Sequence, residues 1–345
     1  MTKLIECVPN FSEGSDLNVI HSITDAIAGV AGIKLLDIFS GAATNRTVVT
    51  FAGTPEAVIE AACRGIEAAS LLIDMSGQKG IHPRMGATDV CPLIPLAGLT
   101  MDETVEYARR LAERVGNELK IPVYCYGYAA FSDGRQRLED IRYGGYDGLK
   151  NKLSLPEWKP DFGPSEWNEK VQKTGSVIIG ARNFLVAYNV NLSTDSPEIA
   201  RNIAAVIREP GERNAEPGGF DNHGDIEKDT RGRLKKVKAI GWYIKEYGCA
   251  QVSMNITDFN VTPVHVAFEE VSRQAKIRGV NVTGSELVGL IPLKAILAAG
   301  RYFIKKTGIK GKLTEKEIIA VGVKHLGLDT IHPFDPDKKV IEYLV

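Results

Sequence analysis

Strand-like and helix-like segments alternate along the first 130 residues, and this alternation is the feature that most constrains the fold. Short apolar runs closed by turn residues predict strands, beginning with Leu4 to Val8, which Pro9 and Asn10 close. Between such runs, apolar residues recur at helical spacing, first from Leu17 to Ile27 and again after Pro55. The order βαβ–βαβ with additional pieces predicts an α+β fold, in which helices cover a mixed or antiparallel sheet.

Two local signals refine this prediction. Thr100 and Glu103 form a capping box, which predicts a helix start at this point. The predicted strand from Val90 to Leu96 contains Pro92 and Pro95, and proline has no amide hydrogen for the sheet ladder. We therefore expect this strand either at an edge of the sheet or interrupted by a bulge.

The second half of the chain repeats the theme after an irregular, proline-rich segment over 151–175. Strands and helices alternate again, starting with a strand from Val186 to Leu192 and including a short strand from Val280 to Val282. The phrase Leu-Ile-Pro-Leu occurs at 93–96 and at 290–293, which is suggestive of an internal repeat. Two similar α+β subdomains predict a ligand site in the cleft between them.

Charge and composition narrow the class of protein. A length of 345 residues corresponds to about two soluble domains. The 42 Lys and Arg are balanced by 43 Asp and Glu, which argues against a basic protein that binds nucleic acid or a membrane surface. No stretch approaches the roughly 18 apolar residues of a membrane helix. The five cysteines are scattered and form no CxxC pair. We expect a cytoplasmic protein with no membrane or nucleic-acid partner, and a charged surface loop over 209–236.

The densest candidate for chemistry surrounds His82. This histidine lies between Gly80 and Gly86, directly before Pro83 and Arg84. An imidazole has an ordinary pKa of about 6.5, so it can accept and donate protons at neutral pH. On spacing alone, a solvent-exposed histidine held in a tight turn is the more common case.

Two further motifs carry polar groups at strand ends. Asn10 and Ser12 follow the first strand and could face a ligand, although capping the next helix is an equal alternative. Arg46 begins a strand, where it could bind a substrate carboxylate or form an ion pair. The sequence contains none of the patterns G-x-G-x-x-G, G-x-x-x-x-G-K-[ST], H-E-x-x-H and G-x-S-x-G, so no nucleotide or metal site is predicted.

These motifs resemble glutamate formimidoyltransferase, whose transferase unit is fused to a cyclodeaminase in vertebrates. The resemblance rests on the segments 6–14, 44–48, 82–92, 160–164, 232–237, 241–243 and 341–345. It is collinear over essentially the whole chain and implies a free-standing enzyme. It also implies two ferredoxin-like βαββαβ subdomains, residues 1–180 and 181–345, with a ligand tunnel between them, and a homodimer.

The resemblance implies transfer of the formimino group of N-formimino-L-glutamate to N5 of tetrahydrofolate. The products would be 5-formiminotetrahydrofolate and L-glutamate, in histidine degradation and one-carbon metabolism. Tetrahydrofolate is then the co-substrate, without metal or nucleotide, and the catalytic histidine corresponds to His82. The folate-binding stretch corresponds to Gly163, Pro164, Ser165, Glu166, Trp167, Asn168, Glu169, Lys170, Val171 and Gln172.

Both ligands of this reaction are anionic. We therefore expect Arg46, Arg84 and Arg182 to bind carboxylates, with Asn10 as a further substrate-binding candidate. Two alternatives stay open at this point. One is formyl transfer from N-formylglutamate, a donor with oxygen in place of NH, and the other is a non-catalytic folate-binding protein.

Overall fold

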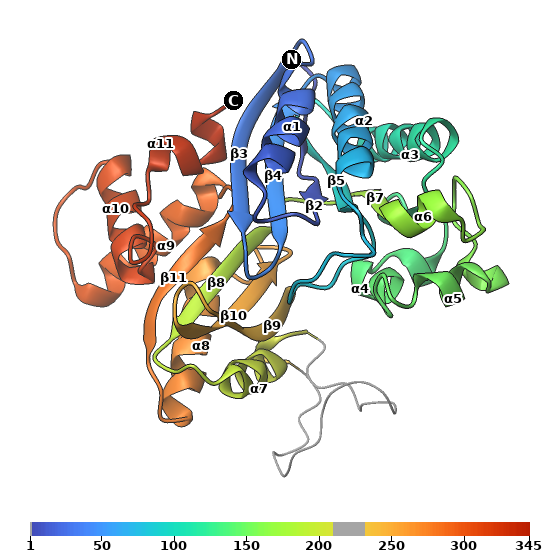
Figure 1. The fold of residues 1–345 in the computed structure, drawn as a ribbon. Coiled ribbons are helices and arrows are strands. Elements are labelled where there is room, and N and C mark those ends of the chain that lie inside the picture. The colour runs from blue at the N-terminus through green and yellow to red at the C-terminus, as the bar shows by residue number, and fades with distance from the viewer. Residues whose placement is uncertain (1, 210–231) are drawn as a thin grey trace. The chain divides into compact units, whose positions relative to one another are not determined.

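The computed structural model describes residues 2–209 and 232–345, and the chain divides into two compact units, Met1–Asn183 and Phe184–Val345. The surface loop expected at 209–236 lies for the most part outside the described residues. Among the helices of the described part, none is both long enough and apolar enough to cross a membrane. Each unit is an α+β structure built on its own sheet (Figure 1).

The first unit begins with the predicted alternation of strands and helices. The capping box starts its third helix, because the Glu103 amide donates to Thr100 Oγ1 over 3.2 Å and the Thr100 amide donates to Glu103 Oε2 over 2.8 Å. Its strands are β1 (Leu4–Cys7), β2 (Asn10–Phe11), β3 (Ile33–Gly41), β4 (Arg46–Gly53), β5 (Thr88–Ala97), β6 (Val123–Gly127) and β7 (Val177–Ala181). Its helices are α1 (Leu17–Ala28), α2 (Pro55–Leu72), α3 (Met101–Glu118), α4 (Leu138–Arg142), α5 (Leu149–Leu153) and α6 (Glu169–Thr174), with 3₁₀ turns at Asp133–Arg135 and Pro156–Trp158.

The sheet of the first unit is mixed. β1 and β2 together occupy one position between β4 and β5, and β3 pairs with the other side of β4, all antiparallel. The chain order β1-α1-β3-β4-α2-β5 and the strand order β3-β4-β1-β5 are those of a βαββαβ unit. β7 and β6 then extend the sheet beyond β5, in parallel.

The expected edge position of the proline-containing strand is wrong, because β5 lies inside the sheet between β1/β2 and β7. The expected irregularity is present. Pro92 lies opposite the break between β1 and β2, where its carbonyl accepts the Val8 amide over 3.2 Å. Pro95 pairs with Ile5, where the register between β1 and β5 shifts. Each proline therefore lies where the ladder is already interrupted, so its missing amide hydrogen is tolerated.

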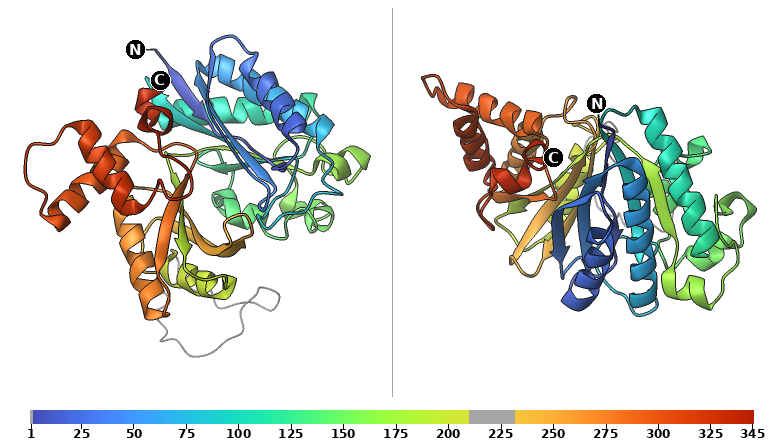
Figure 2. Two further views of the ribbon diagram at one scale, coloured as in Figure 1. Left: turned by 60° about the vertical axis from the view of Figure 1, so that its left-hand side comes forward. Right: turned by 90° about the horizontal axis from the view of Figure 1, so that it is seen from above.

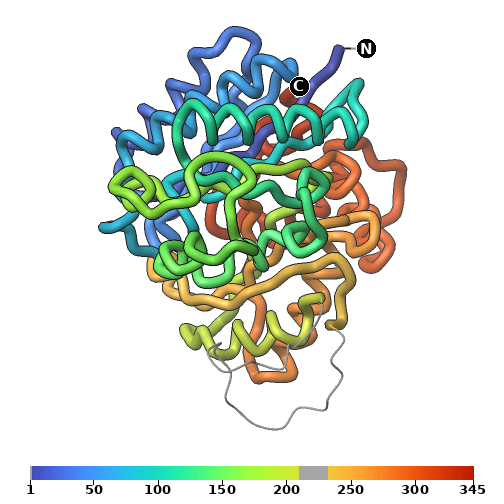
Figure 3. The backbone as a smooth tube through the Cα atoms, turned by 90° about the vertical axis from the view of Figure 1, so that its right-hand side faces the viewer, coloured from blue at the N-terminus to red at the C-terminus, as the bar shows by residue number. Residues whose placement is uncertain are grey.

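The two faces of this sheet differ in character. α1, α2 and α3 cover one face and bury a large apolar core that includes Ile5, Cys7 and Phe11 (Figure 2). Because side chains alternate along a strand, Glu6 and Asn10 point to the opposite face. A smaller apolar cluster covers one end of that face and comes mainly from the segment between β6 and β7, the green group of short helices in Figure 3.

The second unit has the same order of elements as the first βαββαβ unit. Its strands are β8 (Val186–Leu192), β9 (Val237–Ile244), β10 (Cys249–Ile256) and β11 (Val282–Val288). Its helices are α7 (Pro197–Ile207), α8 (Val264–Ile277), α9 (Leu293–Thr307), α10 (Glu315–Leu326) and α11 (Pro336–Lys339), followed by a 3₁₀ turn at Ile341–Tyr343. Within the described residues its strands form an antiparallel sheet in the order β11-β8-β10-β9.

The repeat therefore exists at the level of topology, because β8, β9, β10 and β11 take the places of β1, β3, β4 and β5. The repeated Leu-Ile-Pro-Leu phrase does not mark it, since residues 93–96 lie within β5, whereas residues 290–292 follow β11 and Leu293 begins α9. The short strand expected at Val280–Val282 is also wrong in extent. β11 runs on to Val288. The polar residues Ser285 and Glu286 interrupt the apolar pattern of the sequence, but both are buried in the strand and have hydrogen-bond partners.

Candidate active site

The three motifs singled out in the sequence lie together in the first unit. The His82 loop connects α2 to β5, and Asn45 holds it by donating from Nδ2 to the Lys79 carbonyl over 2.8 Å. Asn45 also accepts the Gly14 amide over 2.9 Å, so it ties the segment after β2 to the same loop. Gly80 packs so closely against this turn that a Cβ atom there would lie 2.5 Å from the Thr44 carbonyl oxygen.

His82 itself is half-buried, and its Nδ1 lies 2.7 Å from the Pro83 carbonyl oxygen. A carbonyl can only accept, so Nδ1 carries the hydrogen and Nε2 keeps its lone pair. Burial, together with the positive charges of Arg46 and Arg142, lowers the pKa of His82 well below its usual range, although Asp89 acts in the opposite direction. The loop therefore holds a neutral imidazole at neutral pH, with Nε2 as the unprotonated ring nitrogen.

Asp89 is the buried anchor of the charged groups beside this histidine. Its side chain is inaccessible to solvent, and Oδ2 accepts Arg46 Nη1 over 2.6 Å and Arg142 Nη2 over 2.7 Å. Oδ1 accepts the Met85 amide over 3.0 Å, which fixes the backbone of the loop close to His82. Burial opposes ionisation of Asp89, but the two guanidinium groups outweigh it and lower its pKa to about 2. Two cations share one carboxylate, so the cluster has an excess of positive charge.

The other residues predicted from the sequence have defined partners. Asn10 does not cap the next helix: its Nδ2 donates to the Val8 carbonyl over 2.8 Å and its Oδ1 accepts Arg46 Nε over 3.1 Å. Ser12 is not a cap either, because its hydroxyl donates to the Gly86 carbonyl over 2.7 Å. Asp16 caps α1 instead.

The predicted arginines occupy different settings. The guanidinium of Arg84 donates to the backbone carbonyl of Gly80 over 3.2 Å and to that of Gln78. It therefore stabilises the backbone of the His82 loop. Arg182 follows β7, and its charge acts on the buried Glu6 and on Tyr126.

Two charged residues of this face were not among the sequence candidates. Arg142 lies on α4, and no motif distinguishes it, because only the fold brings it to Asp89. Glu6 is 4% exposed and lies in the otherwise apolar strand β1. A charged residue inside an apolar strand is a signal that could have identified it. Burial raises the pKa of Glu6 to about 7, although the charge of Arg182 lowers it.

The stretch Gly163 to Gln172 leads into α6, where Asn168 caps the helix by accepting the Val171 amide over 3.0 Å. Gly163 has φ 82° and packs against the Ile121 carbonyl, which suits glycine alone. Tyr146 connects this stretch to the histidine loop. Its amide donates to the Arg84 carbonyl over 2.9 Å, and its hydroxyl donates to the Gln172 carbonyl over 2.5 Å.

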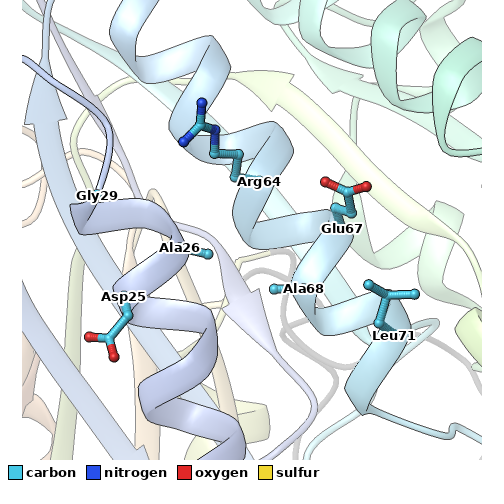
Figure 4. A pocket seen from close by; sticks show the side chains of 7 residues that line it. All are labelled: Asp25, Ala26, Gly29, Arg64, Glu67, Ala68 and Leu71. Carbon is cyan, nitrogen blue, oxygen red and sulfur yellow. The ribbon is translucent and has the colours of Figure 1, made fainter.

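A separate hollow lies between α1 and α2 on the helical side of the first unit (Figure 4). Its lining consists of Asp25, Ala26, Gly29, Arg64, Glu67, Ala68 and Leu71. None of these residues belongs to the His82 cluster. In the described part of the chain, no group of three or more His, Cys, Asp or Glu side chains is arranged to hold a metal ion.

Family models account for both units of the chain. The formiminotransferase domain, N-terminal subdomain, matches residues 4–182, and the formiminotransferase domain matches residues 187–345. The chain belongs to the formiminotransferase family. Its relatives include the formimidoyltransferase-cyclodeaminase of Mus musculus, which is 48% identical over 345 residues and matches 100% of this chain. The match covers 60% of that relative, so the chain spans less than two thirds of its length.

Shorter relatives match along nearly their whole length. The glutamate formimidoyltransferase of Thermoplasma acidophilum is 41% identical over 91% of this chain and 97% of its own. That of Streptococcus pyogenes serotype M1 is 40% identical over 88% of this chain and 94% of its own. Among solved structures, the peptidase M16 inactive domain of Pseudomonas fluorescens aligns with a TM-score of 0.17 and 10% identity over 96% of this chain and 85% of its own, too low to indicate a shared fold.

Proposed function

We propose that this formiminotransferase-family chain transfers the formimino group of N-formimino-L-glutamate to N5 of tetrahydrofolate. The products are 5-formiminotetrahydrofolate and L-glutamate, a step of histidine degradation that supplies one-carbon metabolism. The names of the two shorter relatives, which match most of this chain, support this choice. The observation that carries the proposal is the neutral His82, with Nε2 unprotonated, beside an excess of positive charge.

The reaction needs one proton moved between two nitrogens. N5 attacks the formimino carbon, and a new C–N bond forms to give a tetrahedral intermediate. His82 Nε2 accepts the proton that N5 must lose and then delivers it to the glutamate nitrogen as the old C–N bond breaks. One positioned imidazole performing both transfers contributes about 10²–10⁴-fold in rate. Because its pKa is held low, the imidazole begins the cycle as a base.

The positive charge of the site suits the anionic ligands. N-formimino-L-glutamate carries two carboxylates, and the glutamate tail of folate carries two more. Arg46, Arg84 and Arg182, with Asn10, supply charge and hydrogen-bond donors for them in this proposal. The stretch from Gly163 to Gln172, which Tyr146 connects to the His82 loop, contributes to binding tetrahydrofolate. A cytoplasmic location and a homodimer also belong to the proposal.

A transfer assay with parallel donors tests the proposal. Purified protein is assayed with tetrahydrofolate and either N-formimino-L-glutamate or N-formylglutamate, for the wild type, His82→Ala and the control His21→Ala, which removes an exposed histidine of α1. We expect turnover of the formimino donor, a loss of at least about 100-fold in His82→Ala, and no loss in the control. Turnover with the formyl donor alone would instead identify a formyltransferase, and tight folate binding without turnover would indicate a binding protein.

Arginine roles are tested by the Michaelis constants for the two substrates. In Arg84→Ala we expect at least one of the two constants to rise, because a positive charge near the ligand carboxylates is lost. If neither constant changed, Arg84 would act on the loop backbone alone.

A further inference from the structure

The loop that carries His82 depends on side chains for its shape. Residues 78–84 all belong to the described part of the chain, and they form neither helix nor strand. Side chains hold their backbone instead: Asn45 donates to the Lys79 carbonyl over 2.8 Å, and Arg84 donates to two further carbonyls of the loop. Whatever fixes Asn45 therefore also fixes the backbone next to His82.

A buried carboxylate, that of Glu13, lies beside this loop. Glu13 comes two residues after β2 and is 9% exposed. Its Oε1 accepts three successive backbone amides, those of Gly14, Ser15 and Asp16, over 2.9, 2.8 and 2.9 Å. Three hydrogen bonds to one oxygen fix the carboxylate, so its other oxygen has a defined direction. Neither the proton transfer nor the carboxylate binding assigned above uses this group.

Gln78 connects the carboxylate to Asn45. Glu13 Oε2 accepts Gln78 Nε2 over 3.2 Å, and Gln78 Oε1 accepts Asn45 Nδ2. Asn45 Nδ2 also donates to the Lys79 carbonyl, and its Oδ1 accepts the Gly14 amide over 2.9 Å. The side chains of Glu13, Gln78 and Asn45, here termed the Glu13 network, thus link the segment after β2 to the His82 loop within the first unit.

Each end of the Glu13 network permits only one direction of hydrogen bonding. The carboxylate only accepts, so it requires the N–H side of the Gln78 amide, whose oxygen then faces Asn45. At the other end the Gly14 amide only donates and the Lys79 carbonyl only accepts. A reversed Asn45 would place donor against donor and acceptor against acceptor. The network therefore has a single arrangement, and the charge of Glu13 sets it.

We propose that Glu13 is a positioning residue for the transfer reaction, an inference that rests on the proposed function. Its carboxylate orients the amides of Gln78 and Asn45, and these amides hold the loop backbone in the conformation that presents the His82 imidazole. A group that transfers protons must lie within hydrogen-bond reach of the reacting nitrogens, so a small displacement of the loop slows the reaction. Glu13 acts through the loop and exchanges no proton.

An exchange of side chains tests this arrangement. Glu13→Gln keeps the oxygen that accepts the three amides but turns an N–H group toward the N–H group of Gln78. Gln78→Glu alone places two carboxylates against each other. The double variant Glu13→Gln/Gln78→Glu restores every hydrogen bond, because the amide at position 13 donates to the carboxylate at position 78, which still accepts Asn45. Glu103→Gln is the matched control, since Glu103 likewise accepts a backbone amide, that of Thr100, but at the start of α3.

Three measurements are made on each variant. The transfer assay with N-formimino-L-glutamate and tetrahydrofolate gives kcat and the Michaelis constants. Hydrogen–deuterium exchange of the peptide over 76–85 reports on the loop without requiring turnover, and thermal unfolding establishes that each variant is folded. We expect kcat of each single variant to fall about 10- to 100-fold, by more than either Michaelis constant rises, and the loop to exchange faster. The double variant should recover both properties, and the control should match the wild type.

Three results would overturn the inference. One is an unchanged kcat in folded Glu13→Gln, and another is faster loop exchange without a loss of kcat. The third is a double variant that performs no better than the single variants. A wild type without turnover would refute the proposed reaction instead. Faster loop exchange in both single variants, reversed in the double variant, would then still show that Glu13 positions the His82 loop.

Discussion

Glu6 offers the most direct test of the electrostatics of the first unit. Its carboxyl group belongs to a side chain that is buried on β1, where the residue is 4% exposed. Burial raises its pKa from 4.5 to about 7, against the charge of Arg182. We predict that Glu6→Gln, which keeps the shape and cannot ionise, stabilises the protein at alkaline pH relative to acidic pH.

The magnitude follows from proton linkage. Between pH 4.5 and 7 the folded protein holds a proton on Glu6 that the unfolded chain has lost, so folding becomes less favourable as the pH rises. At about 1.4 kcal/mol for each pH unit, the cost reaches about 3 kcal/mol above pH 7 and vanishes below pH 4.5. Glu6→Gln removes this cost. The free energy of unfolding of Glu6→Gln minus that of the wild type should therefore increase by about 3 kcal/mol from pH 4.5 to pH 7.

Urea unfolding of the two proteins at pH 4.5, 6, 7 and 8 measures this difference. Comparing wild type with variant at each pH cancels the titration of every other group, including His82. Glu106→Gln, which removes an exposed carboxylate from α3, is the control and should show no such gain. A difference between wild type and Glu6→Gln that stays constant across the pH range would refute the reasoning.

Three further predictions concern other groups. Asp89→Asn leaves the guanidiniums of Arg46 and Arg142 without their buried counter-charge, so the free energy of unfolding should fall by about 3 kcal/mol or more in urea titrations; a loss below 1 kcal/mol would contradict this. In the transfer assay, kcat/KM should stay level as the pH falls to 6.5 and decline only below it, because the pKa of His82 is lowered; an acid limb centred above 6.5 would count against a neutral His82. Thr100→Ala should cost about 1 kcal/mol of stability at pH 7 through loss of the α3 capping box, with unchanged transfer activity.

The local signals in the sequence determined most of the elements and their order. Alternating apolar periods predicted the strands and helices of both βαββαβ units, and Thr100 with Glu103 predicted where α3 begins. The motifs around Asn10, Arg46 and His82 identified these three polar residues of the first unit, whereas Arg142 and Glu6 were not among the candidates. Such signals are readable because capping, helical period and turn chemistry involve residues close together in the chain.

The tertiary structure decided which distant residues meet. It placed β5 inside the sheet. The prolines of β5 are tolerated there because Pro92 lies opposite Val8 and Pro95 opposite Ile5, where β1 and β2 are interrupted. The tertiary structure also brought Arg142 to Asp89 and joined Asn191, Gln251 and Glu286, from three different strands, in one hydrogen-bond network. The sequence identifies which residues could take part in chemistry. The pKa values and hydrogen bonds of these residues depend on burial and on neighbours that only the folded chain supplies.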